Sequence, residues 1–511
     1  METSSQNSKI NITISAKDLP QNGSCAILVI QEEDEWRELG RTEFQSSKKP
    51  KFQESLIADF EFGQIQNFRI ILCSHQKGLF SEGFGYVQFT LGELIVKHRS
   101  SITKQLLDPT SNKSTAGIVS LIATEIKKEN LDLSLRWRCK KIKKLSNKSS
   151  AYLKFYAIKP KGEKIKIYKT LSVSNAQDLK WDPKRITTQE LCKGDENNEI
   201  FVELWEQKSE EKEKLFAVGS TLLQKIVNEG NDFQLPLIAP SNQNKKKAKA
   251  LCVLQSYKFM QQIQNSLFDF FSANISLSLS FAVDFTASNG RPEFPKSLHF
   301  LDPPNKNVYE SVISLLGNSL IPYMGAETMI PCFGFGGKIN TLRGNQDSIC
   351  FPLNGNTENP ECDGLEGVLS AYENALKSVA LHGPTSVTNI IQGITYMTKQ
   401  QGDNKYTVLV IITDGVPIDI NQTRKLISKS AKQAMSVIFI GVGDEDFDEL
   451  KDICEFNSKK STRDNCKFVL FDKKMKNNPK LFVQKSVSQI SPQILQRMRI
   501  NQQKPNKILM N

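Results

Sequence analysis

The sequence predicts two antiparallel β-sandwiches followed by an α/β domain with a doubly wound, Rossmann-like parallel sheet. Short alternating strands separated by turn residues recur from residue 9 to about residue 240, which is typical of sandwiches. From about residue 277, apolar runs alternate with amphipathic stretches, which indicates parallel strands joined by helical crossovers. The length of 511 residues also suits three domains at about 150 residues each.

The two β regions form a tandem repeat, because their strands follow in similar order and at similar spacing. The strands expected in the first unit are residues 9–15, 25–30, 68–73 and 85–91. Those expected in the second unit are residues 131–137, 152–156, 163–169 and 199–205. We therefore expect one sandwich over residues 1–126 and another over 127–240, followed by a polar, basic linker at 241–260.

The α/β domain is expected over residues 261–475, with a Lys/Gln/Asn-rich tail at 476–511 that is helical over 480–498. Its predicted strands are residues 277–284, 329–334, 406–413, 435–441 and 467–471. Its predicted helices are residues 306–320, 364–380, 386–400, 420–434 and 445–454.

The charge of the chain favours an acidic partner. The net charge is +12, and residues 127–169 hold fifteen Lys/Arg against three Asp/Glu. Such a basic segment suits anionic lipid, nucleic acid or an acidic protein, and otherwise serves as a solvated surface. Nucleic acid is the weaker alternative, because no nucleic-acid-binding motif accompanies the lysines and several aromatic residues among them belong in a sandwich core.

The cysteines and the hydropathy pattern predict a cytoplasmic protein. Ten cysteines are scattered without a CxxC pair, which argues against a zinc site and favours reduced, buried thiols. No uncharged apolar run reaches the roughly 18 residues of a membrane-spanning helix. The first residues lack a basic start and an apolar core, so we expect no signal peptide.

Three oxygen-bearing residues follow the first strand of the α/β domain. Asp284, Thr286 and Ser288 alternate directly after an apolar run, and Asp414 ends the apolar run at 406–413. Carboxyl ends of parallel strands meet at one edge of a sheet, and the turn that holds Thr385 precedes a helix in the same domain. Two carboxylates with several hydroxyls suit a hard cation such as Mg²⁺ or Mn²⁺. The alternative for the first three residues is an Asx-type turn that closes the strand.

These motifs resemble the copine family, which carries a von Willebrand factor A-type domain with a metal-ion-dependent adhesion site (MIDAS). The sequence Val-Asp-Phe-Thr-Ala-Ser-Asn-Gly at 283–290 looks like a copine signature. Further segments are similar and occur in the same order: 333–338, 359–368, 371–372, 383–385, 412–416, 436–443, 463–464 and 468–471. The two β units then look like the paired C2 domains of copines.

The resemblance implies a cytosolic protein that binds phospholipid through its C2 pair when calcium is present. It also implies protein partners for the A-type domain and roles at the plasma membrane in membrane trafficking and signalling. Copine C2 loops need several aspartates, and here Asp18, Glu82 and Glu206 are weak remnants of them. Lys144 and Ser150 stand at further carboxylate positions, and a lysine there repels Ca²⁺. We therefore expect weak or absent Ca²⁺ binding by either C2 unit.

Lysines on the second C2 unit provide an alternative route to anionic lipid. Strand alternation is expected to place Lys164, Lys166 and Tyr168 on one face, with Lys154 on a neighbouring strand. Each basic residue near an anionic surface contributes about 1 kcal/mol, which salt diminishes. The alternative is an ordinary soluble edge strand that carries lysines.

The resulting hypothesis is a peripheral membrane adaptor that is not an enzyme. The alternatives are a soluble protein-interaction scaffold without lipid binding and a metal-dependent phosphoryl-transfer enzyme. The enzyme hypothesis is disfavoured because the sequence has no Walker A loop, HExxH or GxSxG motif. His299 and His382 lie in the A-type region without a recognisable nucleophile beside them.

Overall fold

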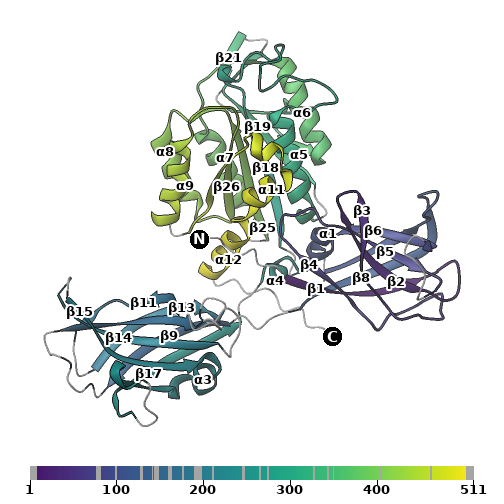
Figure 1. The fold of residues 1–511 in the computed structure, drawn as a ribbon. Coiled ribbons are helices and arrows are strands. Elements are labelled where there is room, and N and C mark those ends of the chain that lie inside the picture. The colour runs from purple at the N-terminus through teal and green to yellow at the C-terminus, as the bar shows by residue number, and fades with distance from the viewer. Residues whose placement is uncertain are drawn as a thin grey trace. The chain divides into compact units, whose positions relative to one another are not determined.

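The computed structural model contains two compact units, Met1–Ile126 with Asn265–Asn511, and Lys127–Gln264 (Figure 1). It describes residues 8–501 with the following gaps: 76–81, 98–99, 127–130, 141, 143–144, 146–148, 159–163, 175–177, 189–190, 192–197, 210–211, 244–247, 264–265, 273–274, 326–327, 342–343, 349, 403 and 461–462. The second unit is one antiparallel β domain. The first unit joins an antiparallel β domain to an α/β domain, so the predicted fold class is confirmed.

The first β domain is an antiparallel sheet with the strand order β3-β2-β5-β6-β7-β8-β1-β4. Its strands are β1 (Ser8–Lys17), β2 (Cys25–Glu32), β3 (Glu35–Arg41), β4 (Leu56–Phe60), β5 (Asn67–Cys73), β6 (Gly85–Thr90), β7 (Ser101–Leu107) and β8 (Ser114–Ile126). A short helix, α1 (Leu91–Val96), follows β6, and Thr90 caps it by accepting the Glu93 N–H. Alternate residues of β1 are buried, as expected for a strand with one face on a core.

The second β domain repeats this arrangement with the order β11-β10-β14-β15-β16-β17-β9-β13, and β12 pairs with β10. Its strands are β9 (Leu131–Lys140), β10 (Ser150–Ile158), β11 (Lys164–Lys169), β12 (Val173–Ser174), β13 (Asp178–Thr187), β14 (Glu199–Ser209), β15 (Lys212–Leu222), β16 (Gln234–Ile238) and β17 (Ala250–Ile263). The helix α3 (Leu223–Glu229) follows β15. The core contains Trp137, Phe155 and Trp181.

The linker expected at residues 241–260 is wrong for its second half. Strand β17 spans Ala250–Ile263 and pairs with both β16 and β9. Its alternating residues Cys252 and Leu254 lie in the core, which draws the segment into the sheet despite its basic lead-in.

The α/β domain is built on a parallel sheet in the order β19-β18-β25-β26-β27. Its strands are β18 (Ser276–Asp284), β19 (Met329–Phe335), β22 (Phe351–Pro352), β23 (Glu361–Asp363), β25 (Lys405–Thr413), β26 (Met435–Gly441) and β27 (Cys466–Leu470). The short β22 and β23 pair antiparallel with β19. A separate small sheet contains β20 (Gly337–Thr341), β21 (Gly344–Ser348) and β24 (Val379–Leu381).

Helices cover both faces of this parallel sheet (Figure 1). They are α4 (Leu267–Ser272), α5 (Val308–Leu320), α6 (Gly364–Ser378), α7 (Thr388–Gln400), α8 (Ile420–Ser430), α9 (Asp448–Lys460), α10 (Lys473–Lys476), α11 (Pro479–Val487) and α12 (Ile490–Ile500). Side chains of α5, α6, α11 and α12 share one core with one face of the sheet. Side chains of α7, α8 and α9 share a second core with the other face. Each predicted strand and helix of this domain is present, with ends within four residues of the prediction, except that α9 continues six residues beyond the predicted end at 454.

The tail expected from residue 476 is corrected over its described part. Helices α11 and α12 bury Phe482, Val487 and Ile494 in the core beside α5. The buried Arg463 binds this segment to the sheet, because its guanidinium donates to the carbonyls of Gln493 and Met435. The helices therefore belong to the α/β domain.

Within the first unit, the first β domain and the α/β domain share a hydrophobic core. Gly63 accepts a hydrogen bond from the Ser319 hydroxyl at 2.5 Å, and the Gly63 N–H donates to the Tyr323 hydroxyl. The ring of Phe62 lies 4.8 Å from that of Tyr323, centroid to centroid. The backbone of Gly63 has a φ of +79°, and a Cβ there would meet Val487, so this contact requires glycine.

The expectation that every cysteine is reduced is corrected at one pair. Cys454 of α9 and Cys466 of β27 form a disulfide. Among the residues that the structure describes, seven other cysteines are outside any disulfide, and all of these except Cys350 are buried. In the part of the chain that the structure describes, no helix is both long and apolar enough to cross a bilayer.

Candidate metal centre

The topology of the α/β sheet brings two carboxylates to one place. In the order β19-β18-β25-β26-β27, the connections change direction between β18 and β25. Such a switch point is where open α/β sheets bind ligands, beyond the carboxyl ends of the strands. Asp284 is the last residue of β18, and Asp414 directly follows β25. The two strands run in register, with Val283 opposite Ile412.

Hydroxyl groups connect these carboxylates in a compact cluster. The Thr286 hydroxyl donates to Asp284 Oδ1 at 2.6 Å and lies 2.9 Å from the Ser288 hydroxyl. The Ser288 hydroxyl donates to Asp414 Oδ1 at 3.0 Å. The structure therefore brings together four of the five predicted metal ligands.

The fifth predicted ligand, Thr385, lies in a segment that borders the cluster. His382 forms a parallel bridge with Thr286, and its carbonyl accepts the Ala287 N–H at 2.9 Å. The Thr385 carbonyl accepts the Ile418 N–H from the loop that follows Asp414. Among the described residues, no hydrogen bond joins the Thr385 side chain to the four clustered side chains. Its role as a ligand stays a prediction.

The two carboxylates are electrostatically strained against each other. Asp284 is fully buried and Asp414 is buried as well. Burial, with repulsion from Asp414, raises the pKa of Asp284 to about 7. Burial also raises the pKa of Asp414. A divalent cation between them would offset both the desolvation and the repulsion.

The donor set fits a hard cation. Every polar side-chain atom in the cluster is a carboxylate or hydroxyl oxygen, and these are the ligands that Mg²⁺ and Mn²⁺ prefer. A softer metal would favour thiolate or imidazole ligands, which the cluster does not supply. Asp284, Thr286, Ser288 and Asp414 are therefore the residues that would hold such an ion.

Sequence reasoning missed the residues that orient Asp284. The Thr413 hydroxyl donates to Asp284 Oδ2 at 2.6 Å. The ring of His299 lies between the Asp284 carbonyl, 2.9 Å from Nε2, and the Tyr372 hydroxyl, 2.8 Å from Nδ1. Burial lowers the pKa of His299 to about 3, so its imidazole is neutral. Thr413 was within reach of sequence reasoning as the neighbour of Asp414, whereas the contacts of His299 join distant segments.

The remnants of the C2 calcium loops are few, and they lie in different local settings. Asp18 follows β1 with a φ of 56°, and Glu82 is exposed just before β6. Glu206, which we placed in a loop, lies inside β14, opposite Ala151 on one side and Lys214 on the other. That placement is wrong because the β14–β15 pairing continues as far as Ser209 and Lys212. Ser150 lies in β10, and Lys144 falls outside the described residues.

The structure places Lys154, Lys164 and Lys166 on one face of the second β domain, and Lys169 rather than Tyr168 joins them. The β10–β11 pairing shifts between Tyr156 and Phe155, which leaves Ile167 without a partner. Such a bulge reverses the alternation of side chains. Tyr168 consequently points into the core, where its hydroxyl accepts the Trp137 indole N–H at 2.9 Å. The prediction that Tyr168 shares the face of Lys164 and Lys166 is therefore wrong.

Lysines on this outer face lie over aromatic rings. Lys169 stands opposite Lys154 across the strand pair. The Lys154 ammonium lies 3.9 Å from the ring centroid of Trp205, and the Lys164 ammonium lies 3.4 Å from that of Phe201. Lys164 and Lys169 also lie 3.6 Å from the carboxylates of Glu203 and Glu213, which partly offset their charge. We call Lys154, Lys164, Lys166 and Lys169 the lysine face.

Comparison with known proteins identifies a copine domain. Residues 297–506 match the copine family, which confirms the resemblance drawn from the motifs. This match includes Asp414 and starts after Asp284, Thr286 and Ser288.

Three solved structures show weak similarity to this chain. The second C2 domain of BON1 has 19% identity and a TM-score of 0.23, covering 27% of this chain and 94% of that one. The calcium-bound tandem C2 domains of extended synaptotagmin 2 have 10% identity and a TM-score of 0.20, covering 50% and 96%. The manganese-loaded TRAP protein of Plasmodium vivax has 15% identity and a TM-score of 0.27, covering 43% and 74%. Likenesses this low carry no argument about ligands, and the fold follows from the topology of the chain itself.

Proposed function

We propose that this chain, which carries a copine domain, is a peripheral membrane adaptor that joins an anionic phospholipid surface to a protein partner. The observation that carries the proposal is the cluster of Asp284, Thr286, Ser288 and Asp414 at the switch point of the α/β sheet. The cluster supplies a divalent cation with oxygen ligands at the carboxyl edge of the sheet.

The α/β domain would recognise a carboxylate on its partner. A bound Mg²⁺ or Mn²⁺ supplies a Lewis-acidic position that a partner's Asp or Glu completes. Hydrogen bonds orient the Asp284 carboxylate, because the Thr413 hydroxyl donates to one of its oxygens and the Thr286 hydroxyl donates to the other. The neutral His299 carries no positive charge that would compete with the cation for the two carboxylates.

The second β domain would contact the lipid without calcium. The lysine face offers four cations on one sheet surface, whereas the loops of Asp18 and Glu82 supply one carboxylate each and Glu206 lies within β14. Attraction to an anionic surface then depends on charge and falls with salt. The protein would act at the cytoplasmic side of a membrane, with the plasma membrane as the expected location.

The metal-dependent arm is tested by partner capture with a matched control. The immobilised chain is incubated with cell extract in Mn²⁺ or in a chelator. We expect proteins that the wild type retains in Mn²⁺ to be lost from the Asp284→Ala variant and kept by Asp452→Ala, which removes an exposed carboxylate of α9. Capture that Asp284→Ala leaves unchanged refutes the metal-dependent arm.

The lipid arm is tested by sedimentation with phosphatidylserine-containing vesicles, with and without Ca²⁺. We expect binding in both conditions and release by salt. Binding in neither condition refutes the lipid arm and leaves a soluble interaction scaffold. Binding in Ca²⁺ alone refutes the calcium-independent mode.

A further inference from the structure

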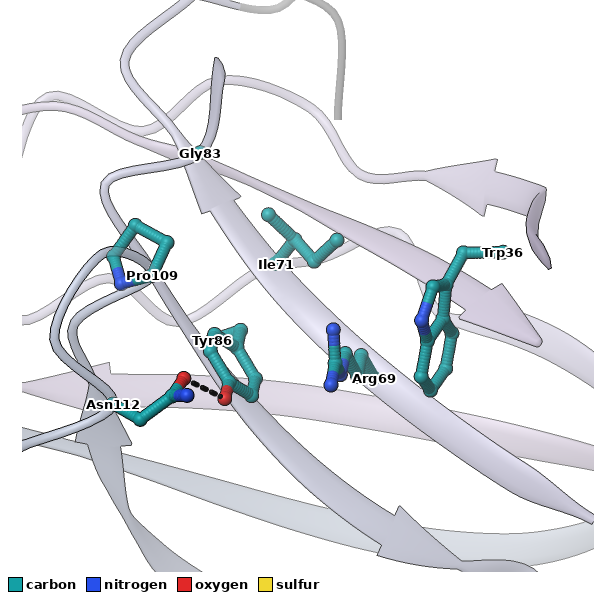
Figure 2. A pocket seen from close by; sticks show the side chains of 8 residues that line it. Trp36, Arg69, Ile71, Gly83, Tyr86, Pro109 and Asn112 are labelled. Carbon is teal, nitrogen blue, oxygen red and sulfur yellow. Dashed lines mark hydrogen bonds between the residues drawn. The ribbon is translucent and has the colours of Figure 1, made fainter. Parts of the chain in front are cut away.

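A pocket of about 380 Å³ opens on the first β domain, outside the candidate metal centre and the lysine face. Strands β3, β5 and β6 and the turn after β7 build it (Figure 2). Pockets that hold small molecules measure about 300–1,000 Å³. This volume therefore suits a small organic molecule better than a bare ion.

A single cation marks the pocket. The Arg69 guanidinium carbon lies 4.2 Å from the ring centroid of Trp36 and 4.4 Å from that of Tyr86 (Figure 2). The two rings hold the plane of the guanidinium, and Nε donates to Gln88 at 3.0 Å. Stacking uses the faces of a guanidinium and leaves the N–H groups at its edge available for hydrogen bonds.

The charge of Arg69 is not neutralised by a neighbouring acid. The nearby hairpin of β2 and β3 holds five carboxylates, of which Glu32 binds Arg37 and Glu38 binds Arg41. Among the residues that the structure describes, no Asp or Glu forms an ion pair with Arg69. A stacked arginine without a carboxylate partner is an available site for an oxyanion.

A second donor lines the same pocket from a rigid turn. The Tyr86 hydroxyl donates to Asn112 Oδ1 at 2.7 Å, which orients the amide N–H₂ group as the free end (Figure 2). Asp108 holds this turn, because its Oδ1 accepts the backbone N–H groups of Thr110 and Ser111. The Thr110 hydroxyl also donates to this oxygen, at 2.6 Å. It contributes most among the hydrogen bonds that lower the pKa of Asp108 to about 2, so the carboxylate holds the turn throughout the physiological range.

We propose that this pocket binds a phosphate group carried by a small organic molecule. The guanidinium edge of Arg69 takes two phosphate oxygens, as in other bidentate arginine–phosphate pairs. The amide N–H₂ group of Asn112 donates to a third phosphate oxygen. A carboxylate ligand has only two oxygens and therefore offers no third acceptor. Ile71, Pro109 and Trp36 provide apolar walls for the body that carries the phosphate. The source is either a soluble organic phosphate or a lipid headgroup, and the experiment separates the two.

Binding is measured by calorimetry with inositol trisphosphate and by sedimentation with phosphatidylcholine vesicles that contain phosphatidylinositol bisphosphate. The full chain is compared with Arg69→Gln, Asn112→Asp and the control Arg37→Gln. Arg37→Gln removes the same charge from the neighbouring hairpin, where the side chain is exposed and paired with Glu32. Asn112→Asp keeps the acceptor for Tyr86 and tolerates the φ of 53° but turns a negative charge toward the phosphate.

We expect Arg69→Gln to weaken binding by about tenfold or more and Asn112→Asp to weaken it similarly, while Arg37→Gln stays near the wild type. Matching thermal midpoints for the four chains exclude unfolding as the cause. Loss of inositol trisphosphate binding with vesicle binding unchanged indicates a soluble phosphate ligand, and loss in the vesicle assay, with or without loss of the soluble probe, indicates a headgroup. Because every variant keeps the lysine face, equal losses in Arg69→Gln and Arg37→Gln overturn the pocket, as does the absence of binding to either probe.

Discussion

The α/β domain and the two β domains differ in the number of oxygen-bearing side chains that they bring to one place. In the α/β domain, parallel strands place Asp284 and Asp414 at one edge, and hydroxyls connect them. In the first β domain, the loops of Asp18 and Glu82 are neighbours, since Gln21 donates to Ser74, but each supplies a single carboxylate. Glu206 of the second β domain lies within a strand. Four oxygen-bearing side chains meet at the edge of the α/β sheet, whereas the neighbouring loops of the first β domain supply one carboxylate each.

The largest expected effect is on metal-dependent stability. Mn²⁺ at about 100 times its Kd should stabilise the wild-type α/β domain by about 2.7 kcal/mol. Asp284→Asn should abolish this gain, because it removes a ligand charge while preserving shape. Thermal unfolding of the full chain with Mn²⁺ or a chelator measures the difference, with Asp452→Asn as the control. If Mn²⁺ raises the thermal midpoint of Asp284→Asn as much as that of the wild type, the α/β domain does not hold the cation through Asp284.

The metal affinity should also depend on pH. The pKa of Asp284 is raised to about 7, and its proton must leave before a cation binds. Mn²⁺ affinity should therefore fall by up to about tenfold for each pH unit below 7. In the metal-free chain, unfolding should become easier as pH rises from 3.8 toward 7, since only the folded state holds this proton. Mn²⁺ titrations from pH 5 to 8 measure the affinity, and denaturant unfolding of the metal-free chain over the same range measures the stability. An Mn²⁺ affinity that does not change below pH 7 refutes the raised pKa of Asp284.

The lysine face should contribute to lipid binding in small, separate increments. Lys154→Gln should weaken binding to phosphatidylserine vesicles by about fivefold, which corresponds to about 1 kcal/mol. Lys164→Gln should have a smaller effect, because Glu203 already offsets part of its charge. The control is Lys225→Gln on α3, which also has an acidic neighbour, Glu229. If Lys225→Gln weakens binding as much as Lys154→Gln, net charge rather than this face explains the attraction.

The smallest effect concerns Tyr168, which separates core packing from lipid contact. Tyr168→Phe loses the hydrogen bond from Trp137 and should lower the free energy of unfolding of the second β domain by about 1 kcal/mol. Vesicle binding should not change under conditions in which the variant is fully folded, because the Tyr168 side chain is buried in the core. Denaturant unfolding and sedimentation measure the two quantities. Weaker vesicle binding with an unchanged free energy of unfolding would show that the Tyr168 side chain lies on the surface and contacts lipid.

The sequence was most informative where burial was continuous. Strands β18, β25 and β26 are apolar along nearly their whole length, so their positions and the meeting of Asp284 with Asp414 follow from the pattern. The bulge at Ile167 has no such signal, because it depends on how two strands pair. The sequence pattern predicts a linker in place of strand β17, because lysines between residues 245 and 249 dominate the segment that leads into it.

The support of the metal centre was the least predictable part. His299 reaches the Asp284 carbonyl from 15 residues away in sequence, and Tyr372 reaches His299 from 73. Such contacts depend on the packing of the loop after Gly290 against α6, which local periodicity does not describe. The pocket around Arg69 likewise combines strands and a turn that are separate in the sequence.

Direct Mn²⁺ titration of the full chain, followed by electron paramagnetic resonance, addresses the metal centre itself. The wild type should show a saturable Mn²⁺ site that Mg²⁺ displaces, and Asp284→Asn should leave the added Mn²⁺ free in solution. Equal binding by the two chains, or no saturable binding by the wild type, would show that Asp284, Thr286, Ser288 and Asp414 do not form a metal site.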